Sequence, residues 1–264
     1  MGDDAALGAL LPIRDRKRIE AGELRCGRVA MWAKAAQMGP GRDLLAAIRS
    51  GGVIAEMKRR SPSGGSLRTD IDPGQLGSAY QAAGAAALSV LTDGPGFGGS
   101  LADLGAVTSA VDVPVLRKDF VVDLVQIAQT RIAGADCVLL IVALLGGTGV
   151  LEAALAGAER AGLSTIVEVH DEDEVRIAVA VGATCIGVNN RDLRSLSSDL
   201  TTFGRLRPMI PAGVVCIAES GIRNSDDVRR LRAEGADAVL AGEALMLAAD
   251  PAAMCAEFVD AMRS

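Results

Sequence analysis

The sequence predicts an α/β fold and, within that class, a closed (β/α)8 barrel. Three observations lead to this prediction. Short continuous apolar runs alternate with helix-like segments, as in a parallel sheet whose strands are buried on both faces. A glycine-centred joint recurs between helix and strand, and 264 residues is a typical length for one such barrel. An open doubly wound sheet is the structural alternative, but no GxGxxG pattern follows the first strand to support it.

Eight apolar runs are the predicted strands, with helices in the intervals between them. The strands are expected at 52–57, 87–92, 113–118, 136–142, 164–169, 184–188, 214–218 and 237–241. Prolines or acids, which favour the first turn of a helix, mark helix starts at 72–73, 171–174, 224–227 and 250–251. The glycine-centred joints lie at 83–85, 133–135, 181–183 and 234–236. Glycine just past a helix suits the left-handed conformation, so these joints predict alternating βα order.

Residues 1–50 precede the first strand and are predicted to be a helical extension packed on the barrel. Residues 51–264 form the barrel itself, so the whole chain is expected to be a single domain, a TIM barrel with an N-terminal helical extension. The extension contains a basic cluster that is more typical of a solvated helix face than of a ligand site. Its members are Arg14, Arg16, Lys17 and Arg18.

Composition and charge exclude several classes of protein. The sequence is 50% hydrophobic and 23% charged, which permits a large core in a soluble chain. A net charge of −6 argues against a nucleic-acid partner but is compatible with a small anionic ligand. With one histidine, His170, the chain is a poor candidate for a His-based nucleophile triad or a multi-histidine metal site. The five cysteines show no CxxC spacing, which fits buried thiols in a reducing cytosol.

Neither a signal peptide nor a membrane span is recognisable. The first residues are acidic where a signal peptide needs basic ones, and the longest apolar run, 137–145, is too short to cross a bilayer. We therefore expect a cytoplasmic protein with no membrane partner, and we expect it to be a monomer.

Charged residues follow the apolar strands at the end where barrels of this kind place their chemistry. Glu56 and Lys58 are two residues apart at the end of the first strand and so share a face. On the barrel interior they would place an acid and a base in one low-dielectric space; the alternative is a structural ion pair. Lys118 ends the third strand, where burial or neighbouring cations would lower its pKa and suit it to general-acid catalysis. The alternative is a surface lysine.

Further strand ends carry groups of similar kind. Glu168 ends the fifth strand, where a carboxyl beside apolar walls would have a raised pKa and could shuttle a proton. Strand alternation places His170 on the same face. Asn189 ends the sixth strand, and its amide could orient a substrate. Phe97 and Phe120 fall in predicted loops after the second and third strands, where they fit either an aromatic-ring pocket or ordinary shielding of the core.

Glycine-bearing loops predict a phosphate site at the same end of the barrel. In barrels the loops after strands 7 and 8 commonly bind phosphate through backbone amides and a short helix. Residues 61–65 also form a flexible, hydroxyl-bearing loop after the first strand. The residues expected at this site are Ser61, Glu219, Ser220, Gly221, Gly242 and Glu243.

Seven stretches, in order along the chain, resemble the indole-3-glycerol phosphate synthase family of tryptophan biosynthesis. They are VIAEMKRRSPSGG at 53–65, SVLTDGPGFGGS at 89–100, PVLRKDF at 114–120, VEVHDEDE at 167–174, IGVNNRDL at 186–193, IAESGI at 217–222 and AGEALM at 241–246. Each lies at a strand end, and together they cover the chain from about residue 50 to its C-terminus. The resemblance implies the decarboxylating, dehydrating ring closure of 1-(2-carboxyphenylamino)-1-deoxyribulose 5-phosphate, with no metal or other cofactor.

The resemblance also implies catalytic roles for individual residues. Lys118 would be the general acid in ring closure, and Glu168 would transfer a proton during dehydration. Lys58, held by Glu56, would bind the anthranilate carboxylate or donate a later proton. Asn189 would orient the substrate.

The same resemblance implies how the substrate is bound. Arg191 would lie near the substrate, and Phe97 and Phe120 would bracket its aromatic ring. The phosphate would be bound by Ser61, Ser220, Gly221, Gly242 and Glu243, with Glu219 in the same set of binding residues.

Two departures from the family pattern leave alternatives open. Residues 1–48 match poorly, and the segment 123–126 lacks the Pro and Tyr that often follow its Asp. One alternative is a catalytically silent or altered-substrate phosphate-binding barrel that serves a specialised pathway. Another sugar-phosphate barrel, phosphoribosylanthranilate isomerase, is disfavoured because it needs a cysteine at the end of strand 1 and an aspartate at strand 6. Those ends carry Glu56, Lys58 and Asn189 instead.

Overall fold

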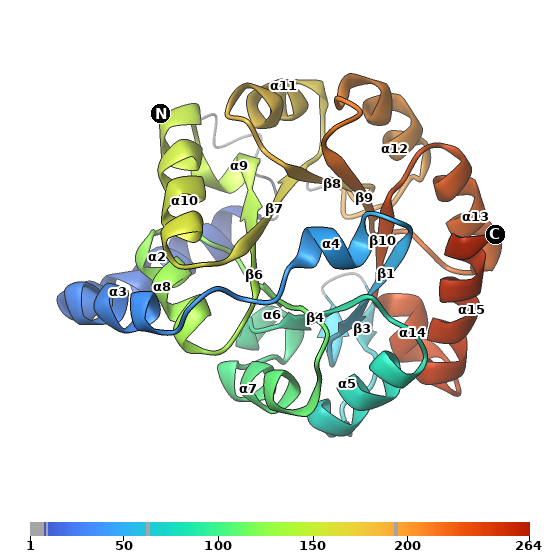
Figure 1. Ribbon diagram of the computed structural model, residues 1–264, viewed down its shortest axis with the longest axis horizontal. Helices are drawn as coiled ribbons and strands as arrows, with labels where there is room; N and C mark the ends of the chain where they lie inside the picture. The colour runs from blue at the N-terminus through green and yellow to red at the C-terminus, as the bar shows by residue number, and fades with distance from the viewer. Residues whose placement is uncertain (1–7, 9, 62–63, 193–194) are drawn as a thin grey trace.

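A computed structural model describes residue 8 and residues 10–61, 64–192 and 195–264. The described residues form eight parallel strands that close into a barrel in the order β1-β10-β9-β8-β7-β6-β5-β4 (Figure 1). Closure is made by β1, which pairs with β4 on one side and with β10 on the other. The predicted (β/α)8 barrel is confirmed, and the open sheet is excluded.

Each predicted strand overlaps an observed one, with ends that differ by two residues at most. The strands are β1 (Gly52–Met57), β4 (Ala87–Leu91), β5 (Val115–Lys118), β6 (Cys137–Ile141), β7 (Ser164–Val169), β8 (Cys185–Asn189), β9 (Val215–Glu219) and β10 (Ala238–Ala241). Two short antiparallel strands, β2 (Arg60–Ser61) and β3 (Gly65–Ser66), form a separate hairpin after β1. Pro62 and Ser63 of the predicted loop lie outside the described residues.

Helices surround the barrel on its outer face (Figure 1). The main ones that follow the strands are α5 (Pro73–Ala82), α7 (Leu101–Ala110), α8 (Val125–Ile132), α10 (Thr148–Arg160), α11 (Glu172–Ala180), α12 (Thr201–Leu206), α13 (Ser225–Ala233) and α15 (Pro251–Arg263). Short helices α6 (Gly94–Phe97), α9 (Val142–Leu145) and α14 (Glu243–Leu247) follow β4, β6 and β10, and the 3-10 turn η2 (Arg207–Met209) extends α12.

The helix boundaries follow from local chemistry. Asp72, Asp171, Asn224 and Asp250 each occupy the N-cap of a helix, where the side chain accepts a hydrogen bond from a free backbone N–H. At the other end, the glycines of all four predicted joints adopt positive φ values between 75° and 97°. A side chain would be strained there, so the glycine ends each helix and turns the chain into the next strand.

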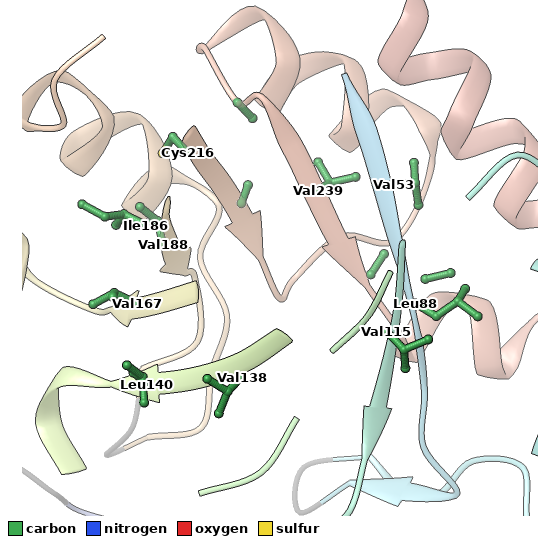
Figure 2. Close-up of a cluster of buried hydrophobic side chains, with 14 of the residues drawn as sticks. Val53, Leu88, Val115, Val138, Leu140, Val167, Ile186, Val188, Cys216 and Val239 are labelled. Carbon is green, nitrogen blue, oxygen red and sulfur yellow. The ribbon is translucent and has the colours of Figure 1, made fainter. Parts of the chain in front are cut away.

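Alternation along the strands separates two apolar cores. Outward side chains from all eight strands pack under the helices; Figure 2 labels Val53, Leu88, Val115, Val138, Leu140, Val167, Ile186, Val188, Cys216 and Val239. Inward side chains fill the barrel, among them Ile54, Leu116 and Ile166. Helix α4 (Leu44–Ile48) belongs to this inner core and leads directly into β1, so it covers the amino-terminal end of the barrel (Figure 1). Only the opposite end is left for a site.

Ahead of α4, the described part of the N-terminal extension contains α2 (Leu10–Leu24), the 3-10 turn η1 (Arg25–Gly27) and α3 (Arg28–Gln37). The expectation that its basic cluster is a solvated face holds for Arg18, which is exposed, but is wrong for Lys17. Lys17 is only 4% exposed because its ammonium pairs with two buried carboxylates of the barrel, Asp93 and Asp119. In the described part of the chain, no helix is both long and apolar enough to span a membrane.

Candidate active site

A cavity of about 880 Å³ opens at the carboxyl-terminal end of the barrel, and every residue for which we predicted a catalytic or binding role lines it. Strand alternation explains why charged groups face inward there. Glu56, Lys118, Glu168 and Glu219 each lie two residues beyond an inward apolar residue on the same strand, so they continue the inner face one layer higher. The sequence therefore places an apolar plug below and a charged layer above it.

Lys118 lies at the centre of this charged layer. Its Nζ is 3.0 Å from Oε2 of Glu168 and 3.7 Å from Oε2 of Glu219. The other oxygen of Glu168, Oε1, accepts a 3.0 Å hydrogen bond from Nδ2 of Asn189. The same oxygen lies 3.2 Å from Nε2 of His170, and this second contact is an ion pair without hydrogen-bond alignment. His170 also contacts Glu174 through Nδ1 at 3.0 Å. Glu168 is thus surrounded by the ammonium of Lys118, the ring of His170 and the amide of Asn189.

The pKa values of Lys118 and Glu168 are shifted in directions that differ from the sequence-based expectation. Burial alone would lower the pKa of Lys118, but the carboxylates of Glu168, Glu219 and Glu56 outweigh it and raise that pKa. Burial alone would raise the pKa of Glu168, but Lys118 and His170 hold it below its ordinary value. The predicted directions, a lowered lysine and a raised glutamate, were both wrong because each group was considered without its partner. Lys118 is therefore an ammonium and Glu168 a carboxylate at neutral pH.

Glu219 is placed differently from the prediction as well. It was expected in the loop after the seventh strand, but it is the last residue of β9 and only 1% exposed. Neither of its carboxyl oxygens has a hydrogen-bond partner among the described residues, and the contact to Lys118 is long. Burial together with the charges of Glu168 and Glu56 raises its pKa to about 8, against the opposing effect of Lys118. Glu219 is therefore protonated at neutral pH, whereas Glu168 is not.

Glu56 and Lys58 form a close ion pair, with 2.6 Å between Oε1 and Nζ. Both side chains line the cavity, so the pair belongs to the site and is not a remote structural bridge. Gly242 packs against it: a Cβ at this position would lie 3.0 Å from the carboxyl carbon of Glu56. Glycine is required there because any side chain would push the carboxylate of Glu56 away from Lys58.

The loops after β9 and β10 form the other half of the cavity. Ser220 has a φ of 66° and Gly221 a φ of 77°, so two consecutive residues adopt the left-handed conformation. Asn190, 2% exposed, holds this turn by donating to the carbonyls of Glu219 and Ser220 at 3.0 and 3.2 Å. Such turns and free helix starts present backbone N–H groups to anions.

Helix α14 provides the free helix start, because it begins directly after Gly242 with no side-chain cap. Beside it, Arg191 lies 3.4 Å from Glu243 and donates to the carbonyl of Leu196 at 3.0 Å. Ser61, on β2, lines the same region, where its Oγ accepts a 2.9 Å hydrogen bond from the N–H of Gly64. The predicted phosphate residues are therefore together, with a guanidinium at their edge.

Phe97 and Phe120 also lie together, with ring centroids 5.9 Å apart and planes tilted by 37°. At this separation the rings contact each other. They therefore form one aromatic wall, with no room for a third ring between them, instead of the expected bracket.

Sequence reasoning missed two residues that shape the site, Asn190 and Gln126. Asn190 follows Asn189 in the sequence and gave no separate signal, yet it fixes the β9 turn. Gln126, in the segment that departs from the family pattern, accepts from the N–H groups of Val122 and Asp123 and donates to the carbonyl of Phe120 at 3.0 Å. Among the described residues, no three His, Cys, Asp or Glu side chains gather in a way that could hold a metal ion.

Fold and site together define a (β/α)8-barrel enzyme with a buried lysine–glutamate pair between an aromatic wall and a left-handed turn. A family profile described as indole-3-glycerol phosphate synthase matches residues 13–258 of the chain. The chain belongs to this family. The match begins well before residue 50, so most of the N-terminal extension belongs to the family pattern, contrary to the poor match expected for residues 1–48.

Individual relatives agree with the family assignment. The chain is 52% identical to the indole-3-glycerol phosphate synthase of Parafrankia sp. over 83% of this chain and 82% of the relative. It is 50% identical to that of Nocardioides sp. over 94% of each. It is also 52% identical to indole-3-glycerol phosphate synthase 2 of Streptomyces coelicolor, over 82% of this chain and 84% of the relative.

Proposed function

We propose that the chain, as an indole-3-glycerol phosphate synthase, closes the indole ring with Lys118 as general acid and Glu168 as base. The substrate is 1-(2-carboxyphenylamino)-1-deoxyribulose 5-phosphate, and the products are indole-3-glycerol phosphate, carbon dioxide and water. The observation that carries the proposal is the Lys118–Glu168 pair at 3.0 Å in the centre of the cavity, with the two groups held in opposite charge states. Ring closure needs both a proton donor and a proton acceptor, and this pair would supply the two groups next to each other.

The first step is carbon–carbon bond formation. The ring carbon that bears the carboxylate attacks the ketone carbon, and the ketone oxygen takes a proton from the Lys118 ammonium. The raised pKa of Lys118 keeps it protonated until negative charge develops on that oxygen. The carbon–carboxylate bond then breaks, carbon dioxide leaves, and its electron pair restores the aromatic ring.

The second step is dehydration. The hydroxyl formed from the ketone leaves as water after it receives a proton, and the neighbouring methylene next to nitrogen loses one to Glu168. A carboxylate with a lowered pKa is present as the base at neutral pH. We assign the proton for the leaving hydroxyl to Lys58, whose ammonium is held by Glu56 at 2.6 Å. The new double bond completes the indole.

Binding groups for both ends of the substrate flank this centre. The turn at Ser220-Gly221, the start of α14 at Gly242-Glu243, and Ser61 and Arg191 would receive the phosphate. Phe97 and Phe120 would offer their shared wall to the anthranilate ring. Asn189, which donates to Glu168 and accepts from the N–H of Arg191, would link the acid–base centre to the phosphate end.

Ring closure can be followed directly because indole fluorescence appears as the product forms. We expect the purified chain to convert the anilino-deoxyribulose phosphate to a fluorescent product with release of one carbon dioxide per indole. The competing function, a silent phosphate-binding barrel, predicts substrate binding with no fluorescence even at high enzyme concentration. The intact set of charged strand ends in one cavity favours the enzyme.

We also propose that the chain acts as a cytoplasmic monomer and without a cofactor. All of the acid–base and binding groups named above come from one chain, so no second copy is needed to complete the cavity. Sedimentation of the purified chain tests the monomer, and a single species at the dimer mass would contradict it. Unchanged turnover after dialysis against a chelator tests the absence of a metal.

A further inference from the structure

Lys17 is a buried cation that belongs to the N-terminal extension but contacts the barrel. Its Nζ lies 3.1 Å from Oδ1 of Asp93, 2.8 Å from Oδ1 of Asp119 and 3.0 Å from Oε2 of Glu20. The side chains of Asp93 and Asp119 are 0% and 2% exposed. Buried charges are kept only when they are paired, so these contacts fix the positions of Lys17, Asp93 and Asp119.

The two buried aspartates each control one turn of the active site. Asp93 caps helix α6 by accepting from the N–H of Gly96 at 2.9 Å, and α6 ends at Phe97. Asp119 lies between Lys118 and Phe120 in the sequence, and its Oδ1 accepts from the N–H of Phe120 at 2.8 Å. The turn after β4 and the turn after β5 therefore meet at one ammonium.

These two turns carry the aromatic wall. Phe97 and Phe120 are 5.9 Å apart, and each is linked to Lys17 through one aspartate. Of the described residues of α2, Leu10 and Ile13 line the cavity, whereas Lys17 does not. Lys17 thus cannot act on the substrate directly, but it couples the docking of α2 to the shape of the ring-binding wall.

We propose that Lys17 is a positioning residue that sets the Phe97–Phe120 wall for the aromatic ring of the substrate. This role rests on the proposed function, because the wall matters for catalysis only if an aryl ring must be placed against it. Misplacement of a reacting ring by about 1 Å costs roughly 10²-fold in rate. Lys17 would therefore influence catalysis without touching the substrate.

The charge of Lys17 can be removed without leaving either aspartate unpaired. Asp93 keeps its 2.7 Å contact with Arg16, and Asp119 keeps Arg117 at 2.8 Å and the hydroxyl of Thr92 at 2.6 Å. Burial works against ionisation of Asp119, but Arg117 and Lys17 lower its pKa to about 2. A Lys17→Met variant should consequently fold into the same barrel, with the turns after β4 and β5 held less firmly.

The test compares kcat/KM for ring closure among variants of the full chain. We expect Lys17→Met to lower kcat/KM by about 10- to 100-fold, Lys17→Arg to retain most of it, and Arg18→Met, on the same helix but exposed, to leave it unchanged. Circular dichroism confirms the fold of each variant. Lys17→Gln, which keeps a donor for the aspartates, replaces Lys17→Met if the latter does not fold.

A double-mutant cycle separates positioning from general stability. If Lys17 acts through the aromatic wall, Lys17→Met should cost less than about threefold in a Phe97→Leu background, because the wall is already lost there. Equal costs in both backgrounds, or full kcat/KM in a folded Lys17→Met variant, would overturn the positioning role while leaving the proposed function intact. A wild-type chain that forms no indole would overturn the proposed function and this role with it.

Discussion

Replacing Lys118 with methionine removes the proposed general acid while keeping most of its apolar stem. The ammonium that is lost lies 3.0 Å from Glu168 and 3.7 Å from Glu219, so two buried carboxyls lose their shared cation. Loss of a positioned general acid lowers kcat by about 10²- to 10⁴-fold, or about 3 to 5 kcal/mol of transition-state free energy. The pKa of Glu168 should also rise in this variant, because burial raises it and Lys118 no longer opposes that effect.

The assay measures kcat from the growth of indole fluorescence, and measures product affinity separately from equilibrium titration. Lys118→Met should lower kcat into the predicted range and still bind indole-3-glycerol phosphate, because the phosphate turn and the aromatic wall do not include Lys118. Lys34→Met is the matched control, since Lys34 is an exposed lysine on α3. A folded Lys118→Met variant with kcat within about threefold of wild type would refute the acid role.

Three further predictions follow from groups around the same centre. Because burial raises the pKa of Glu219 to about 8, against about 4.3 in an unfolded chain, the folded state binds the extra proton and stability should fall as pH rises between these values. Thermal unfolding of Glu219→Gln should lack this fall, and an identical pH slope in both proteins would argue against the shift. Contacts with Glu168 and Glu174 raise the pKa of His170 to about 10 despite its burial, so the NMR signals of this one histidine should stay those of an imidazolium at pH 7.5; a midpoint near 6.5 would contradict it. Gly242→Ala should lower kcat/KM by about tenfold or more by displacing Glu56 from Lys58, whereas Gly105→Ala, where a Cβ meets open space, should not; equal activity of the two variants would show that the close packing at Gly242 is unimportant.

The barrel could be predicted because the sequence signals for its strands, helix caps and helix ends are local and recur along the chain. Gly84 and Gly235 end their helices in the positive-φ conformation that the joints implied, and Asp72 and Asn224 cap the helices that were expected to start beside them. Strand ends were harder to predict, since an apolar run stops at the first charged residue even where the strand continues. That is why Glu219, which follows the run 214–218, was expected in a loop but is found on β9 inside the barrel.

Charge states and long-range pairs could not be predicted from local pattern. The direction of the pKa shift of Lys118 depends on which carboxylates face it from other strands, and that is known only once the barrel is closed. Arg16 and Lys17 look like an ordinary basic helix face because Asp93, their partner, lies 77 residues beyond Arg16 in the sequence. The buried cation of the extension is therefore a tertiary feature, although every residue in it is visible in the sequence.

The most direct test of the site is a crystal structure of Lys118→Met soaked briefly with substrate and frozen, since this variant should bind the substrate and turn it over only slowly. The structure should show the phosphate at the Ser220-Gly221 turn and the start of α14, the aryl ring against Phe97 and Phe120, and the ketone oxygen facing residue 118. A phosphate bound elsewhere, or a ketone pointing away from residue 118, would contradict the assignment of this cavity to ring closure.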